Sequence, residues 1–211
     1  DNDMGPNTGG MGAYSPAPII TKDLHKKIMD QVIKPTINGM KSDGIKFCGF
    51  LYAGLMIDKN KNIKTLEFNC RMGDPETQPI LFRLKSDLLP LLLNATNNDL
   101  HNSSIEWDDH FSITVVMASQ NYPSTPKLGD TITGLDSSKS ISDSFVFHAG
   151  TKLENEQLKT SGGRVLGVTA KGLSLVEAKK KVYQLIKKIN FDGAQYRKDI
   201  ADKALNIIDE K

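Results

Sequence analysis

Residues 67–78 read Glu67-Phe-Asn-Cys-Arg-Met-Gly-Asp-Pro-Glu-Thr-Gln78, and this stretch decides how the rest of the chain is interpreted. We expect a strand over 63–70 that runs directly into a charged loop. Because side chains alternate along a strand, Glu67 and Asn69 share one face. A carboxylate and an amide carbonyl supply the oxygen ligands that Mg²⁺ prefers. The pattern predicts a metal-binding pair with Arg71 and Asp74 close behind it, although a half-exposed strand with one polar face is the alternative.

Regular elements are expected on both sides of this stretch. A helix should begin at about Lys22 after a Thr21 cap. Pro35 should end or kink this helix, and Gly44 should mark its end. Ser174 opens a capping box and a helix that runs to Ile189. Shorter helices are expected over 77–83, 86–97 and 200–208. Short strands are expected over 47–57, 111–118, 131–134, 144–149 and 164–170.

The polar segment 98–110 is the best candidate for a boundary, because few residues in it can join a core. It predicts one domain over 1–100 and a second over 101–211. The chain opens with Asp1-Asn2-Asp3, and residues 1–20, which are rich in glycine and proline, are expected to form an ordered loop with no helix or strand. An opening of this kind suggests a fragment of a longer protein.

Composition excludes several classes of protein. The 211 residues hold 27 Lys and Arg against 25 Asp and Glu, a net charge of +2. A general nucleic-acid or membrane-surface binder needs a concentrated basic field, so neither partner is expected. No apolar run approaches the ~20 residues of a spanning helix. Two cysteines, Cys48 and Cys70, cannot build a disulfide framework, so a cytoplasmic location is expected.

The segment Gly5-Pro-Asn-Thr-Gly-Gly-Met-Gly12 is a second candidate site. Clustered glycines allow positive φ angles and close approach of the backbone, with N–H groups turned toward an anion. We expect a loop that cradles a phosphate or a carboxylate. A flexible linker is the alternative that composition leaves open.

Arginine is scarce, with four Arg among the 27 basic residues. In such a lysine-rich chain, an arginine is expected at positions that need a planar, bidentate hydrogen-bond donor. Arg71, Arg164 and Arg197 are therefore candidates for binding carboxylate or phosphate, whereas Arg83 is expected in an ordinary surface salt bridge.

Three long motifs stand in a fixed order along the chain, over residues 3–18, 49–56 and 67–78, and three shorter ones follow over 147–151, 162–166 and 196–200. Together they resemble the glycinamide ribonucleotide synthetase family, the phosphoribosylamine–glycine ligases of the ATP-grasp superfamily. The resemblance implies an α+β fold. Residues 1–100 would be the second half of an ATP-grasp domain, and residues 101–211 a small β-rich C-terminal hybrid-motif domain with a packed helix.

The resemblance also implies an enzyme, an ATP-dependent carbon–nitrogen ligase of purine biosynthesis. It would join glycine to 5-phosphoribosylamine, through a glycyl phosphate intermediate, to give glycinamide ribonucleotide, ADP and phosphate. About half of the family's chain would be missing, so the N-terminal half is an expected partner and this chain is not expected to turn over alone.

The implied roles fall on the motif residues. Glu67 and Asn69 would hold the Mg²⁺ or Mn²⁺ that accompanies ATP, and Arg71 would offset charge on the transferring phosphoryl group. Asp74 would fix Arg71 or the glycine ammonium group. Arg164 and Arg197 would contact the ribose phosphate. The opening loop would close over both substrates through Asp3, Asn7, Thr8, Gly9, Gly10, Met11 and Gly12.

One stretch departs from the superfamily pattern. Many ATP-grasp enzymes carry another acidic ligand on the preceding strand, but residues 49–53 contain no acid. Other atoms would have to complete the metal shell. Two alternatives stay open: another ATP-grasp ligase, such as a carboxylase subunit, and a binding or docking module without catalytic activity.

Overall fold

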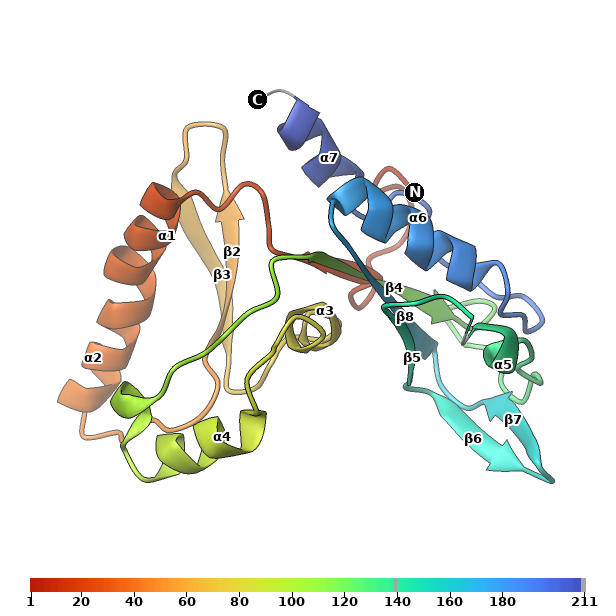
Figure 1. Cartoon of the computed structure of the whole chain (residues 1–211), viewed down its shortest axis with the longest axis horizontal. Helices are drawn as coiled ribbons and strands as arrows, with labels where there is room; N and C mark the ends of the chain where they lie inside the picture. Colours follow the sequence, from red (N-terminus) through yellow and green to blue (C-terminus); the bar gives the residue numbers. More distant parts are fainter. Residues whose placement is uncertain (139, 210–211) are drawn as a thin grey trace. The chain divides into compact units, whose positions relative to one another are not determined.

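The computed structural model describes residues 1–138 and 140–209. The chain divides into two compact units (Figure 1). Unit 1 comprises Asp1–Ala17, Asp74–Arg83 and Asp108–Lys211, and unit 2 comprises Pro18–Gly73 and Leu84–Trp107. The two units are groups of residues that pack together, and each combines separate stretches of the sequence. The domain boundary expected near residue 100 stays a prediction. Among the described residues, no helix has both the length and the apolar character needed to cross a membrane.

Unit 1 is built on a four-stranded antiparallel sheet in the order β1-β4-β8-β5. Its strands are β1 (Gly12–Ser15), β4 (Phe111–Ala118), β8 (Arg164–Gly172) and β5 (Ser144–His148). The expected strand over 111–118 is confirmed to the residue. The unit also holds the hairpin β6 (Thr151–Glu154) and β7 (Gln157–Thr160) and the helices α3 (Thr77–Leu81), α5 (Leu135–Ser138), α6 (Leu175–Ile186) and α7 (Asp202–Asp209).

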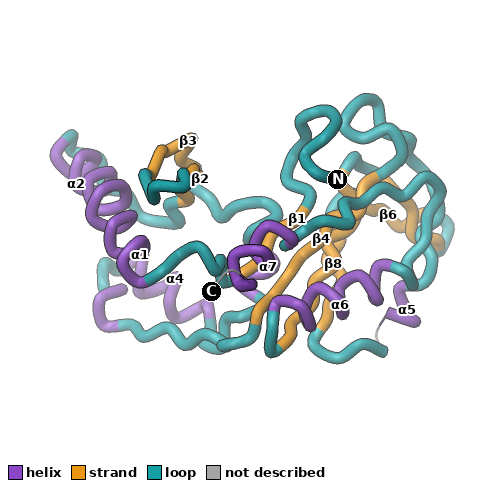
Figure 2. The backbone as a smooth tube through the Cα atoms, turned by 90° about the horizontal axis from the view of Figure 1, so that it is seen from above, coloured by secondary structure: helices purple, strands orange, loops and turns teal. Residues whose placement is uncertain are grey.

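The core of unit 1 lies between the sheet and α6, which runs along the sheet in Figures 1 and 2. Alternation turns Ile113 and Val115 of β4 into this core, where neither is exposed to solvent. The apolar face of α6 meets them with the residues that the 3.6-residue period predicts, namely Leu175, Ala178, Val182, Leu185 and Ile186. Helix α3 packs against β1, β4 and β8.

Local chemistry explains where α6 begins. Ser174 Oγ accepts a hydrogen bond from the Glu177 N–H at 3.1 Å, as the capping box predicts. The Glu177 carboxylate accepts from the Leu173 N–H at 2.8 Å, one residue earlier than expected. The helix ends at Ile186, so the expected end at Ile189 is three residues too late, although Ile189 is buried.

Unit 2 contains the helix α1 (Lys22–Ile28), a π-helical turn (Met29–Ile33) and α2 (Lys34–Ser42) in direct succession. Thr21 Oγ1 caps α1 by accepting from the Leu24 N–H at 3.2 Å. Pro35 does not end the helix, because it directly follows the π-helical turn, an irregularity of the kind that accompanies proline within a continuous helix. Gly44, with φ +78°, follows the end of α2 as expected.

A hairpin of β2 (Tyr52–Ile57) and β3 (Ile63–Asn69) follows, with α4 (Leu88–Thr96) and a 3₁₀ turn (Leu100–Asn102) later in the chain. β2 begins five residues later than the expected position 47, because Gly49 with φ +140° interrupts the extended backbone. β3 and α4 match their expected ranges to within two residues.

Three expectations were wrong in unit 1. Residues 131–134 form no strand but two isolated bridges, Thr131 with Lys159 and Thr133 with Asn190, before Gly134 turns the chain at φ +86°. The segment 1–20 is not all loop, since β1 pairs with β4 along the edge of the sheet. Ile200 precedes α7 instead of lying in it, because Ala201 has φ +73°.

Candidate functional site

Glu67 and Asn69 lie on the same face of β3, as alternation predicts. Glu67 stands opposite Gly54 of β2, and a Cβ atom on Gly54 would come within 3.1 Å of Glu67 Cγ. Gly54 therefore leaves room for the Glu67 side chain. Leu66 and Phe68 point the other way and are 65% and 43% exposed.

The donor set fits a hard cation. Two oxygen donors two residues apart suit Mg²⁺, which usually keeps several water ligands and relies on one or two protein carboxylates. Over the described ranges, no group of three or more His, Cys, Asp or Glu side chains could hold a metal. Arg71, which follows the pair, is exposed, and its Nη1 atom donates to the Met72 carbonyl at 2.9 Å.

In unit 1, Asp74 pairs with Arg164. Arg164 Nη2 and Nη1 donate to the two carboxylate oxygens of Asp74 at 2.5 Å and 3.2 Å. Nη1 also donates to the Gly10 carbonyl at 3.1 Å. Such a bidentate arrangement fixes the plane of the guanidinium group. One hydrogen-bonded group thus links the loop after β3, the start of β8 and the opening segment.

The glycines of the opening segment serve close packing more than unusual backbone angles. A Cβ atom on Gly10 would lie 2.3 Å from Pro75 Cδ, and one on Gly12 would lie 2.8 Å from both the Ile200 side chain and the Thr114 carbonyl oxygen. Among Gly5, Gly9, Gly10 and Gly12, the left-handed region is occupied by Gly5 at φ +103°. The Gly9 N–H donates to the Tyr122 hydroxyl at 3.1 Å, so this N–H has a protein partner in place of the expected anion.

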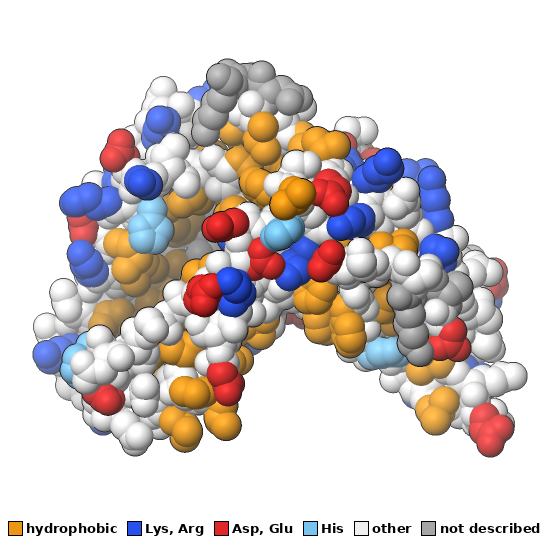
Figure 3. All heavy atoms as spheres, in the orientation of Figure 1, with side chains coloured by type: hydrophobic (Ala, Val, Ile, Leu, Met, Phe, Trp, Pro, Cys, Tyr) orange, Lys and Arg blue, Asp and Glu red, His pale blue; other side chains and the backbone are white. Residues whose placement is uncertain are grey.

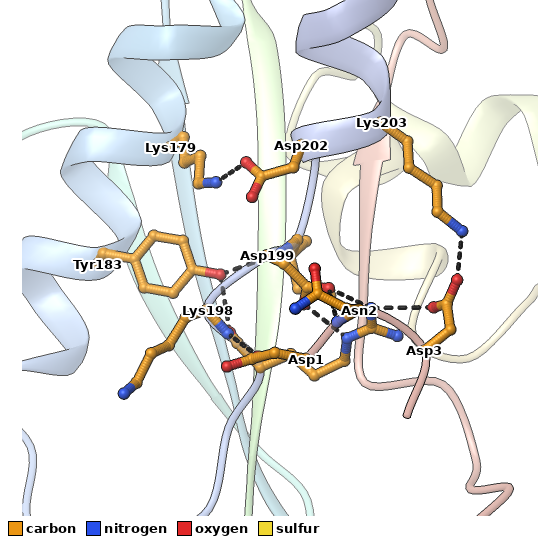
Figure 4. A network of polar contacts seen from close by, with 11 residues as sticks. Asp1, Asn2, Asp3, Lys179, Tyr183, Lys198, Asp199, Asp202 and Lys203 are labelled. Carbon is orange, nitrogen blue, oxygen red and sulfur yellow. Dashed lines mark hydrogen bonds and ion pairs between the residues drawn. The ribbon is translucent and has the colours of Figure 1, made fainter. Parts of the chain in front are cut away.

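A charged network fastens the first three residues to the C-terminal part of unit 1 (Figure 4). Arg197 Nε and Nη2 donate to the Asp199 carboxylate at 2.7 and 2.5 Å, and Nη2 also donates to Asp3 at 3.0 Å. Lys203 Nζ donates to the other Asp3 oxygen at 2.5 Å. The Asn2 N–H donates to Asp199 at 2.7 Å.

The network shifts the titration of its members. Hydrogen bonding to Lys203, and next to Arg197, lowers the pKa of Asp3. Hydrogen bonding to Arg197 lowers the pKa of Asp199, and the same pair raises the pKa of Arg197. Burial raises the pKa of the neighbouring Tyr183 to about 12. All four groups therefore keep one charge state over the whole neutral range.

A cavity of about 460 Å³ opens beside this network within unit 1. Asp3 and Arg197 line it together with Asn7, Thr8 and Met11 of the opening segment. Tyr122, Pro123 and Gln195 also contribute to the wall. Five expected substrate-binding residues thus share one cavity, whereas Arg164 lines a different and smaller one.

Sequence reasoning missed Tyr122, Asp199 and Gln195 as parts of this site. Tyr122-Pro123 carries no motif, and its role depends on the loop after β4 meeting the opening segment. Arg83 is not in the expected surface salt bridge. It donates to the carbonyls of Asp108 and His110 and to Ser15 Oγ, so its partners are mainly backbone.

Comparison with known proteins places these residues in context. Residues 1–77 match the model described as phosphoribosylglycinamide synthetase, ATP-grasp (A) domain, and residues 112–203 match the model of the C domain of the same enzyme. The chain belongs to the phosphoribosylglycinamide synthetase family. The mixed α and β architecture with antiparallel sheets agrees with that family, which confirms the expected α+β class.

Relatives extend the match over nearly the whole chain. The chain is 54% identical over 205 residues to a phosphoribosylamine–glycine ligase of Ralstonia nicotianae, covering 97% of this chain and 48% of that protein. A crystal structure of the Thermotoga maritima phosphoribosylamine–glycine ligase matches with a TM-score of 0.82 and 33% identity, over 94% of this chain and 48% of that one. The chain spans about half the length of the curated relatives it matches.

A more distant match is informative about fold alone. The crystal structure of a Kluyveromyces lactis urea carboxylase aligns with a TM-score of 0.61 at 17% identity, over 90% of this chain and 16% of that one. At that identity the similarity shows a shared backbone fold and gives no information about the substrate of this chain.

Proposed function

We propose that this chain is part of an ATP-dependent ligase that joins glycine to 5-phosphoribosylamine, the second step of purine biosynthesis. The observation that carries the proposal is the 54% identity to a phosphoribosylamine–glycine ligase over 97% of the chain. The products are glycinamide ribonucleotide, ADP and phosphate. The glycine carboxylate takes the terminal phosphoryl group of ATP, and the amine nitrogen of the ribosylamine then attacks the carbonyl carbon as phosphate leaves and the nitrogen loses a proton.

For such a reaction the protein needs to position the substrates and neutralise charge more than to supply a nucleophilic side chain. Glu67 and Asn69 are the residues that would hold Mg²⁺ or Mn²⁺, and a bound divalent ion neutralises the charge of the ATP phosphates. Arg71 adds a guanidinium group to the same strand end. Residues 49–53 of the preceding segment carry no acid, so water, phosphate oxygens or another residue would complete the metal shell.

The cavity of about 460 Å³ in unit 1 suits the ribosylamine phosphate. Arg197 lines it and is oriented by Asp3 and Asp199. Within the part of the chain that the structure describes, its Nη1 group has no hydrogen-bond acceptor, which leaves two donors for a phosphate. Asn7 and Thr8 add polar groups to the same wall.

On this proposal the partner of the chain is the remainder of the ligase, and ATP, glycine and the ribosylamine are its ligands. Basic and acidic side chains lie interspersed on the face seen in Figure 3, in keeping with small-molecule substrates. A cytoplasmic location stays a prediction from the cysteine content.

The test is a hybrid ligase that joins this chain to the part of the Ralstonia nicotianae ligase that it does not cover. Purified hybrid ligase is expected to release ADP only when glycine and phosphoribosylamine are both present. The complete Ralstonia enzyme serves as the positive control. A hybrid ligase that folds but releases no ADP would contradict the proposal, and dependence on bicarbonate would favour a carboxylase.

A further inference from the structure

Tyr122 stands in the loop that follows β4, on the wall of the larger cavity of unit 1. Its hydroxyl group accepts a hydrogen bond from the Gly9 N–H at 3.1 Å. We propose that Tyr122 is a positioning residue of the ligase, which holds Asn7 and Thr8 of the opening segment at the cavity wall. The inference rests on the proposed function and goes beyond it, because it gives a role to a residue that lies outside all six motifs of the sequence.

The opening segment has few anchors between its charged tether and β1. Among the described residues, no hydrogen-bond partner engages residues 5–8. The first bonds after this gap are that of the Gly9 N–H to Tyr122 and that of the Gly10 carbonyl with Arg164 Nη1 at 3.1 Å. The polar side chains that the gap contributes to the cavity therefore depend for their placement on the peptide groups that directly follow them.

The backbone of Gly163 supports the Tyr122 ring. A Cβ atom on Gly163 would lie 2.5 Å from Tyr122 Cδ2 and 2.8 Å from Cε2, so the ring packs directly on the glycine backbone. The Tyr122 N–H donates to the Ser119 carbonyl at 3.2 Å, and the N–H of the fully buried Ser119 donates to the Gly163 carbonyl at 2.8 Å. The hydroxyl group is thus presented to Gly9 from loops that are fastened to β4 and β8.

The hydroxyl group and Gly9 fit closely. A Cβ atom on Gly9 would lie 2.9 Å from the Tyr122 hydroxyl oxygen and 3.3 Å from Arg164 Cζ, so the absence of a side chain permits the approach. A tyrosine hydroxyl can accept and donate, and across residues 1–138 and 140–209 nothing accepts its proton. Toward the opening segment Tyr122 therefore acts as an acceptor, and phenylalanine cannot replace it in that role.

The direct test compares Tyr122→Phe with Tyr122→Leu in the ¹⁵N-labelled chain. Tyr122→Phe keeps a ring on Gly163 and removes the acceptor. Amide hydrogen exchange at Gly9 should accelerate about tenfold, the scale of one hydrogen bond, and the amide signals of Asn7 and Thr8 should shift. Tyr122→Leu should show the same changes. The melting temperature of Tyr122→Phe should stay close to that of the wild type, because the lost bond is exposed.

Tyr14→Phe is the matched control. It removes a tyrosine hydroxyl from β1 that has no hydrogen-bond partner in the described part of the chain, so exchange at Gly9 should stay at the wild-type rate. Wild-type exchange at Gly9 in Tyr122→Phe would overturn the proposal. If Tyr122→Leu alone disturbed the segment, the ring would act by packing and the hydroxyl group would have no positioning role.

The hybrid ligase separates this role from the proposed function. Tyr122→Phe should raise the KM for phosphoribosylamine about tenfold and leave the KM for ATP unchanged. An active hybrid ligase whose KM for phosphoribosylamine is unaffected would overturn the positioning role and leave the proposed function intact. A folded parent hybrid ligase that releases no ADP would contradict the proposed function, and faster Gly9 exchange in Tyr122→Phe would then still support the hold of Tyr122 on the segment.

Discussion

Arg197 Nη2 lies 3.0 Å from Asp3 Oδ1, although the two residues are 194 positions apart in the sequence. This bond joins the opening segment to the loop before α7, on the wall of the larger cavity. Charged side chains therefore fasten the residues that precede the glycine-rich segment, while backbone hydrogen bonds of Gly9 and of β1 hold the segment itself.

This tether should respond to acid in a defined direction. The pKa of Asp3 and of Asp199 is lowered in the folded protein, so the tether is complete at neutral pH and is lost as pH falls below the ordinary value of 3.8. NMR titration of the carboxyl carbons should place both midpoints below that value. Lys203→Met should move the Asp3 midpoint upward. An Asp3 midpoint at or above 3.8 in the wild type would contradict the network.

The two threonines at the centre of the sheet form a buried pair. Thr114 Oγ1 and Thr169 Oγ1 are 2.7 Å apart on adjacent strands. Thr114→Val should lower the free energy of unfolding by about 1–3 kcal/mol, because it leaves Thr169 without that partner. The double variant with Thr169→Val should regain part of the loss in urea denaturation followed by circular dichroism. Strictly additive losses would exclude the pairing.

Arg83 should contribute to stability through backbone carbonyls. Burial lowers its pKa, and its donors satisfy the carbonyls of Asp108 and His110. Arg83→Met should cost about 1–3 kcal/mol, since it leaves those carbonyls unpaired. The matched control is Lys26→Met, which removes an exposed ion pair with Asp30 and should change little. Equal melting temperatures for the two variants would refute this role.

Gly10 is the glycine whose replacement should disturb the opening segment most directly. A Cβ atom there would lie 2.3 Å from Pro75 Cδ, so Gly10→Ala must displace the segment. Amide signals of Asn7, Thr8 and Met11 should shift in the variant. In Gly39→Ala, those signals should stay in place while the helix gains up to about 1 kcal/mol. Unchanged signals in Gly10→Ala would mean that the close packing is unnecessary.

Local patterns predicted the elements that carry strong periodicity. The buried face of α6 and the bounds of β4 follow from apolar spacing, and Thr21 and Ser174 act as the expected caps. β1 could not be predicted, since its four residues directly follow a glycine-rich loop and become a strand only by pairing with β4. The β6–β7 hairpin lacked a turn signal, because its positive φ angles fall on Asn155 and Glu156 instead of glycine.

In the candidate site too, local relationships could be predicted from the sequence and long-range contacts could not. Alternation was enough to place Glu67 and Asn69 on one face, because that relationship is local. The pairing of Arg164 with Asp74 and that of Arg197 with Asp3 were beyond sequence reasoning, since they depend on contacts across 90 or more positions. Gln78 was part of a recognised motif, yet its buried oxygen is visible only once α3 is packed.

The central proposal is that Glu67 and Asn69 hold the divalent cation that accompanies ATP. The most direct measurement is ADP release by the hybrid ligase carrying Glu67→Ala, at saturating Mg²⁺, glycine and phosphoribosylamine. We expect the rate to fall by orders of magnitude while the circular dichroism spectrum and melting temperature stay close to those of the parent hybrid ligase. A rate near that of the parent would contradict the metal assignment.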